Sequence, residues 1–138
     1  KADGEDLNSI LTGIKQQKGN IHLNIGAPLT EEEIEAASLC DKNDRYQLIR
    51  HAVDIRVIEG YKLWKTNYIA YDIIGGEGKY AGQYTEEEYA AFVEYMEKQL
   101  STVEPELDRN ELRQIFLGIY ANPSVSKEKL KAERESAE

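Results

Sequence analysis

The apolar residues follow a helical spacing over most of the chain and a strand spacing in one short stretch. In residues 20–25, Ile21, Leu23 and Ile25 alternate with polar residues, which is the period-two pattern of a half-buried β-strand. The backbone N–H and C=O groups of a strand need partners, and no other stretch predicts an equally clear strand. The partner strand is therefore expected from a second copy of the chain or from sequence outside these 138 residues.

The other apolar residues mark helices. Intervals of three and four predict helices over residues 5–18, 44–59, about 66–74, 85–100 and 108–121. Two T-x-x-E capping boxes, Thr30 with Glu33 and Thr85 with Glu88, predict helix starts, because the paired side chains satisfy free backbone donors. The helix over 44–59 is apolar around much of its circumference, so we expect it to be mostly buried.

Glycine and proline divide these helices. Residues 75–82 hold four glycines, which predicts a flexible loop, and Asn122-Pro123 is expected to end the helix before it. The charged tail, 123–138, predicts a solvated helix or a disordered segment. The pattern as a whole predicts a mainly α fold: a bundle-like helical body with one N-terminal β-strand.

Composition narrows the possible partners. The net charge of −9 argues against nucleic acid or an anionic membrane as a ligand, since phosphate contacts need clustered Lys and Arg. No apolar run reaches the length of a transmembrane helix, and Cys40 is the only cysteine, so no internal disulfide can form. We expect a reducing, cytoplasmic location. A chain that begins at Lys1 without Met is expected to be an excerpt of a longer protein, with a mature secreted protein as the alternative.

Catalytic and metal-binding patterns are weak. His51 and Asp54 lie three residues apart on a predicted helix, where a carboxylate could orient a general base, although a surface pair is the simpler interpretation. One cysteine and two distant histidines do not form a zinc pattern, and the acidic clusters lack the pattern of a calcium loop. The glycine-rich loop follows a predicted helix and so does not fit a dinucleotide site. We predict no catalytic residue, no metal and no cofactor.

One aromatic stretch, YKLWKTNYIAYD, is poorly explained as core. Its aromatic and basic side chains could stack on a ligand or lie at a membrane interface, whereas the favoured interpretation is a junction with a neighbouring domain. The candidate residues for either role are Lys62, Trp64, Lys65, Tyr68 and Tyr71.

Residues 6–33 resemble the end of the catalytic domain in the glycerophosphate acyltransferase family, which includes 1-acylglycerol-3-phosphate acyltransferases. That family carries a late strand with the pattern h-x-h-x-h-G-x-P-h (h, apolar), which here runs from Ile21 through Gly26 and Pro28 to Leu29. Residues 61–74 further resemble the helical extension that follows that domain in some bacterial members.

The resemblance implies a division of the chain and a function for its parent. Residues 1–29 would end an α/β catalytic domain, 30–122 would form a helical C-terminal domain, and 123–138 would be the charged tail. The parent would transfer an acyl chain from a thioester to the hydroxyl of a lysophospholipid, on the inner face of the cytoplasmic membrane. The family's catalytic H-x-x-x-x-D motif is absent, since Ala27 follows His22 by five residues and Arg56 follows His51 by five.

Three functions remain open at this point. The first is a non-catalytic portion of such an acyltransferase, whose partner is the upstream catalytic domain; cut free, it would expose the strand and self-associate, as a dimer. The second is a free-standing acidic helical module that binds a partner helix. The third is a small enzyme that uses His51 and Asp54. Under the first, Ile21, Leu23 and Ile25 are expected to be exposed in one copy; under the second, they are expected to be buried.

Overall fold

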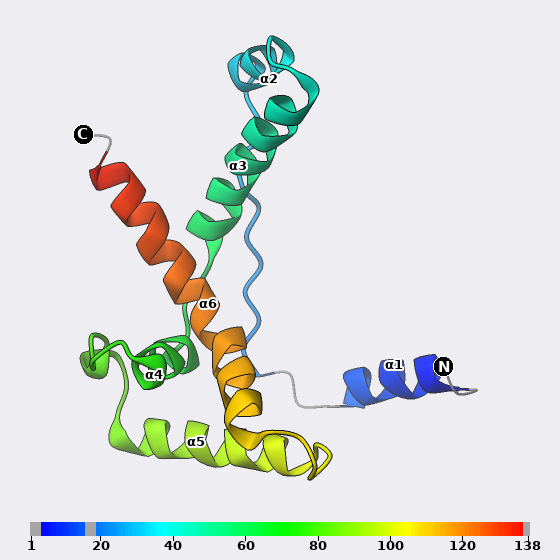
Figure 1. Cartoon of the computed structure of the whole chain (residues 1–138), viewed down its shortest axis with the longest axis vertical. Helices are drawn as coiled ribbons and strands as arrows, with labels where there is room; N and C mark the ends of the chain where they lie inside the picture. The colour runs from blue at the N-terminus through cyan, green and yellow to red at the C-terminus, as the bar shows by residue number, and fades with distance from the viewer. Residues whose placement is uncertain (1–3, 16–18, 137–138) are drawn as a thin grey trace.

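The structure, a computed structural model, describes residues 4–15 and 19–136. Within these ranges the chain is mainly helical and contains no β-strand (Figure 1). The helices are α1 (Glu5–Lys15), α2 (Glu31–Ser38), α3 (Lys42–Gly60), α4 (Lys65–Ile74), α5 (Glu86–Ser101) and α6 (Arg109–Glu135), with a short 3₁₀ helix, η1 (Ala81–Gln83). The mainly helical prediction is therefore confirmed and the predicted strand is not.

Local capping places the helix starts where the sequence predicted them. Thr30 and Thr85 form complete capping boxes with Glu33 and Glu88. The Asp108 carboxylate accepts hydrogen bonds from the N–H groups of Asn110 and Glu111, so it caps α6. Each cap satisfies backbone donors that have no partner inside the helix.

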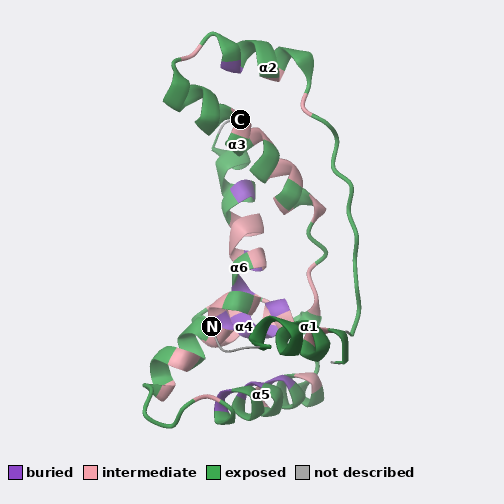
Figure 2. Cartoon of the chain, turned by 90° about the vertical axis from the view of Figure 1, so that its right-hand side faces the viewer, coloured by how far each residue is buried: buried purple, intermediate pink, exposed green. Residues whose placement is uncertain are grey.

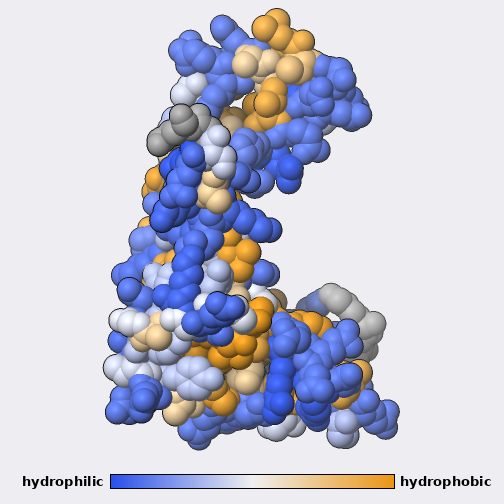
Figure 3. Space-filling view, turned by 60° about the vertical axis from the view of Figure 1, so that its left-hand side comes forward, coloured by the Kyte–Doolittle hydropathy of each residue, from blue (hydrophilic) through white to orange (hydrophobic). Residues whose placement is uncertain are grey.

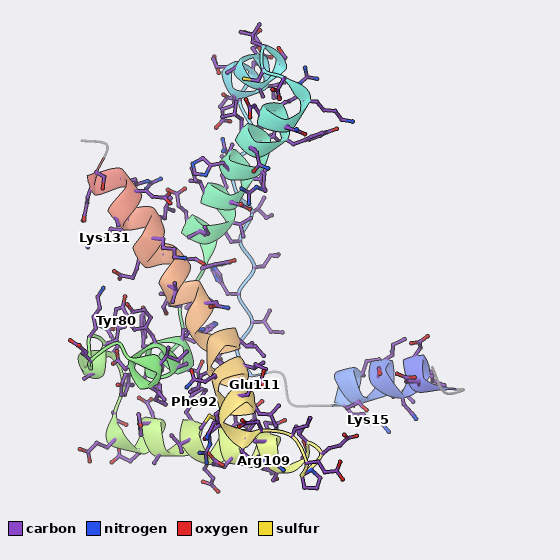
Figure 4. The ribbon with its side chains drawn as sticks, in the orientation of Figure 1. Lys15, Tyr80, Phe92, Arg109, Glu111 and Lys131 are labelled. Atoms are coloured by element: carbon purple, nitrogen blue, oxygen red, sulfur yellow. The ribbon has the colours of Figure 1, made fainter. Side chains whose placement is uncertain are left out.

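The hydrophobic core lies where α4, α5 and the first half of α6 meet, and the buried residues of Figure 2 gather there. α4 makes its widest contact with α6. Phe92 points from α5 into this junction, as its place between the helices in Figure 4 shows. The central members are Ile69, Ala70, Phe92, Met96, Leu100, Leu117 and Ala121.

α6 continues through Pro123, so the predicted stop at Asn122-Pro123 is wrong. Proline removes one N–H, which leaves the carbonyl of Ile119 without its usual helical donor. One residue further on, the Asn67 side-chain amide donates to the Tyr120 carbonyl at 2.8 Å. Packing against α4 and this bond support the helix at the point where its own ladder is weakest. The second half of α6 is not simply solvated, because Ser124 and Leu130 are buried; residues 137–138 of the tail lie outside the described residues.

α3 is not the mostly buried helix that its composition predicted. None of its residues is buried, and its apolar side chains remain largely exposed, including Tyr46, Leu48, Val53 and Val57. α3 contacts α2 and α6, and these two neighbours are too few to cover an all-round apolar helix. α1 begins as predicted and is described as far as Lys15, and it contacts no other helix of the described chain.

Polar contacts join the C-terminal end of α3 to α6. The side chain of Arg134 forms an ion pair with Glu59, and Lys127 donates to the Glu59 carbonyl at 3.2 Å. Both cations come from the second half of α6. The continuation of α6 beyond Pro123 therefore positions α3.

Replacing the buried Asn67 by alanine is expected to destabilise the fold by about 2–3 kcal/mol, because the Tyr120 carbonyl and the Trp64 N–H would both lose their hydrogen bonds to the Asn67 side chain. The control is Asn122→Ala, an exposed position on α6, which should change the free energy of unfolding by less than about 0.5 kcal/mol. Urea denaturation measures both. Equal losses for the two variants would show that the Asn67 bond does not support the junction.

Candidate functional site

Residues 19–30 form an extended segment between α1 and α2 that runs beside α3 with its apolar side chains turned outward. Ile21, Leu23 and Ile25 are 81%, 82% and 88% exposed. Figure 2 shows the segment as an exposed trace along the edge of the molecule. The arrangement is the reverse of a normal half-buried strand, because the apolar face is the one without contacts.

The polar side of the segment faces α3. A Cβ added at Gly60 would lie 2.0 Å from the Asn24 amide nitrogen, so the glycine lets the segment approach the end of the helix. Gly26 lies against Arg56 less tightly, since an added Cβ would lie 3.4 Å from the Arg56 Cβ. The segment therefore lies antiparallel to the C-terminal half of α3.

The predicted strand does not form because its backbone has no partner strand. No backbone–backbone hydrogen bond in the described ranges involves residues 20–29. The chain is extended and has the alternation of a strand, but a helix surface offers no row of free N–H and C=O groups. A β-strand needs such a row from another strand.

Arg56 fixes the segment to α3. Its guanidinium donates to the Pro28 carbonyl at 3.3 Å, to the Glu33 carboxylate at 2.7 Å and to the Ala52 carbonyl at 2.7 Å. The Thr30 N–H and the Arg56 side chain both hydrogen-bond the Glu33 carboxylate and lower its pKa. Glu33 thus serves at once in the capping box of α2 and in the ion pair with α3.

A groove of about 730 Å³ lies behind the segment, between it, α3 and the start of α4. It brings together candidate residues that are far apart in sequence: Leu23 of the segment, with Lys62 and Trp64 of the α3–α4 connection. The Lys62 ammonium lies 4.6 Å from the centre of the Trp64 ring, a cation–π distance.

The other predicted site residues lie elsewhere. Lys65 forms an ion pair with Glu88 of α5. The rings of Tyr68 and Tyr71 pack on Tyr80, with centres 4.8 Å and 5.2 Å apart. The aromatic stretch therefore divides between the groove and a separate tyrosine cluster.

The tyrosine cluster holds the glycine-rich loop, which is not the loose connection that its composition predicted. Figure 4 labels Tyr80 where the loop passes α4. The Asp72 carboxylate accepts from the Tyr80 N–H at 3.0 Å and from the Tyr84 hydroxyl at 2.8 Å. The Glu128 carboxylate accepts from the Tyr80 hydroxyl and from Lys79. The loop is thus fastened to both α4 and α6.

Protonation states follow from these contacts. The hydrogen bonds from Lys79 and Tyr80 lower the pKa of Glu128. Burial and the bond to Asp72 raise the pKa of Tyr84 to about 12. Burial, with the Glu128 bond as a second cause, raises the pKa of Tyr80.

His51 and Asp54 do not form the predicted pair. Among the hydrogen bonds of the described residues none joins them, and Asp54 lies 3.7 Å from Arg50 in an exposed ion pair. Both line a shallow hollow of about 190 Å³ between α3 and α6. The hollow contains no nucleophile oriented by His51, since its only hydroxyl is that of Ser126 and no hydrogen bond between the two is seen.

Neither a metal centre nor a membrane span is found in the part of the chain that the structure describes. No group of three or more His, Cys, Asp or Glu there could hold a metal ion. Its helices are too short or too polar to traverse a bilayer. Comparisons with protein-family models, with curated proteins and with solved structures found no match to this chain.

Sequence reasoning missed the residues that build the site. Arg56 and Glu33 are 23 residues apart, and Asn67 bonds to a carbonyl 53 residues away, so no local pattern indicates either contact. Gly60 follows the last residue of the predicted helix 44–59, and the pattern does not indicate that a glycine there also permits the approach of Asn24.

Tyr84→Phe is expected to destabilise the protein at neutral pH and to lose this effect in alkali. The pKa of Tyr84 is raised from 10.0 to about 12, so its bond to Asp72 contributes fully below pH 10.0 and is lost as the pH rises toward 12. Urea denaturation of both proteins across this range measures the difference. Tyr46→Phe, at an exposed position on α3, is the control, and a difference at Tyr84 that does not change with pH would contradict the assignment.

Proposed function

We propose that this chain is the C-terminal, non-catalytic portion of a bacterial lipid acyltransferase. Its parent transfers an acyl chain from a thioester donor to the hydroxyl of a lysophospholipid-type acceptor. The observation that carries the proposal is the exposed, extended segment with unpaired backbone, Ile21 to Ile25, which leads directly into Gly26-Ala27-Pro28. This is the stretch whose residues resemble the late strand of the acyltransferase domain.

The segment has what a sheet edge requires. From Ile21 to Ile25 the described backbone makes no backbone–backbone hydrogen bond and the apolar side chains alternate, so a neighbouring strand would supply hydrogen bonds and cover the side chains in one step. α1 precedes it with an uncovered apolar face, whose members are Leu7, Ile10, Leu11 and Ile14. A helix followed by a strand, both apolar on one side, is the unit that packs against an α/β sheet.

In the parent, this chain completes the sheet and shapes the acceptor site, while the upstream catalytic domain supplies the chemistry. No residue here takes the role of the family's histidine base. We place the parent in the cytoplasm, peripheral on the inner face of the membrane. The free chain self-associates as a dimer through residues 20–25, because an unpaired edge is a template for another strand.

The second candidate function is an acidic helical interaction module. The exposed apolar side chains of α3, among them Val53 and Val57, could receive a partner helix. If the chain were such a module, Ile21, Leu23 and Ile25 should be buried within one copy. Their exposure of more than 80% supports the acyltransferase portion instead.

The mass and the sequence of the native polypeptide test the proposal. An antibody raised against this chain isolates it from the source cells for mass determination and peptide sequencing. We expect a mass well above 15.7 kDa, peptides that contain H-x-x-x-x-D, and acyl transfer from a thioester to a lysophospholipid. A native mass of 15.7 kDa, or a larger protein without that motif and activity, would overturn the proposal.

Lysine substitutions in the extended segment should have different effects in the isolated chain and in the parent protein. In the isolated chain, held at concentrations where it stays monomeric, Leu23→Lys and Ile25→Lys should change the free energy of unfolding by less than about 0.5 kcal/mol, since both side chains are exposed in one copy. In the parent they should cost roughly 3 kcal/mol or more, because a charge would be buried in the sheet. Asn20→Lys, at an exposed polar position outside the apolar alternation, is the control. Tolerance of all three lysines in the parent would contradict strand pairing.

A further inference from the structure

The groove behind the extended segment has the size and walls of a small-molecule site. Its volume of about 730 Å³ lies within the range of roughly 300–1,000 Å³ that is usual for ligand pockets. Apolar side chains line most of it, from the segment, from α3, from the α3–α4 connection and from α6. They include Leu29, Val53, Val57, Trp64 and Pro123. Figure 3 shows hydrophobic surface at the upper end of the molecule and over its lower body, beside hydrophilic surface.

The polar residues that line the groove favour a negatively charged ligand. No Asp or Glu lines it, although the chain as a whole carries a net charge of −9. Glu33 neutralises Arg56, so the available cation is Lys62, whose ammonium lies over the Trp64 ring at the groove wall. His22 and Asn24 add side chains that can donate hydrogen bonds.

The C-terminal end of α3 does not offset the preference of the groove for an anion. The carbonyls of a helix C-terminus carry partial negative charge, which would repel an anion. Here the Glu59 carbonyl accepts from Lys127 at 3.2 Å and the Ile58 carbonyl accepts from the Tyr61 N–H at 3.2 Å. α4 begins at Lys65, so its N-terminal partial positive charge lies on the Trp64 side of the groove.

We propose that this groove binds a single-chain amphiphile with an anionic head. The chain lies along Val53, Val57 and the Trp64 ring, and the head lies at Lys62. Carboxylate and phosphate monoester heads share this chemistry, so a fatty acid and a phosphorylated single-chain lipid are the two sources to be distinguished. The proposal goes beyond the function proposed above, because every residue of the site belongs to this chain and no acyl transfer is needed to detect binding.

The only tryptophan of the protein reports on the groove directly. The full chain is titrated, below the micelle concentration of each probe, with dodecanoate, dodecyl phosphate, dodecyl maltoside and dodecyltrimethylammonium, and separately with inorganic phosphate. We expect saturable changes in Trp64 emission with the two anionic amphiphiles, at affinities about tenfold above those of the neutral and cationic probes. The ratio of the two anionic affinities identifies the preferred head.

Two pairs of variants test the parts of the site. Lys62→Gln should weaken binding of the preferred anionic probe about five- to tenfold and leave the neutral probe unchanged, whereas Lys98→Gln, at an exposed position on α5, should change neither. Val57→Asp should abolish anionic binding, and Val57→Asn, of nearly the same size but uncharged, should retain most of it. Val57 is 48% exposed, so α3 tolerates both substitutions.

Three outcomes would overturn the proposal: no emission change with any amphiphile, equal affinity for neutral and anionic probes, or equal binding of inorganic phosphate alone. These outcomes are independent of the acyltransferase test. Failure of the groove titration leaves the pairing of residues 20–25 untouched, and a native mass of 15.7 kDa would leave groove binding untouched.

Discussion

The buried side chain of Asn67 is the constraint on which the rest of the arrangement depends. Its carbonyl accepts from the Trp64 N–H at 2.6 Å, which starts α4, and its amide donates to the Tyr120 carbonyl beside the proline of α6. One side chain thus caps one helix and supports another where proline weakens it. Because the second half of α6 carries Lys127 and Arg134, which hold Glu59 of α3, the position of α3 also follows from this junction.

The two parts of the molecule differ in what stabilises them. Around Phe92, three helices bury a continuous apolar cluster, which is the main source of folding free energy. α2, α3 and the extended segment instead rest on polar contacts such as Arg56 with Glu33, and they leave large apolar side chains uncovered. Polar contacts at partly exposed positions contribute little net stability, so this half has surface available for a partner.

The groove lies at the boundary between these two parts. Trp64 and Asn67 come from the well-packed side, and Leu23 and Val57 from the uncovered side. A ligand there, or a strand paired with the segment in front of it, would cover apolar surface that the chain alone leaves in water. The two proposals therefore concern neighbouring faces of the same segment: its outward side chains in one case, and the space behind it in the other.

The sequence by itself determined the local elements. Thr30, Thr85 and Asp108 start their helices as predicted, because a cap needs only residues within the next turn. Helical spacing likewise located most helices. The alternation at Ile21, Leu23 and Ile25 predicted a half-buried strand, and the structure has no strand there. Of the candidate site, Leu23, Lys62 and Trp64 were recognisable as unusual residues, but nothing local indicated that they share a groove.

Tertiary structure decided the rest, because those features depend on partners distant in sequence. The extended segment did not become a strand, since a strand exists only against another strand. α6 passes through Pro123 because α4 supports it there, and α3 stays exposed because the described chain brings too few neighbours to it. Arg56 binds Glu33, which lies 23 residues away in the sequence. The residues of the aromatic stretch divide between the groove and the tyrosine cluster. Hydrogen bonds within one helical turn depend on neighbouring residues and can be predicted from the sequence. Burial depends on how the helices pack and can be known only from the tertiary structure.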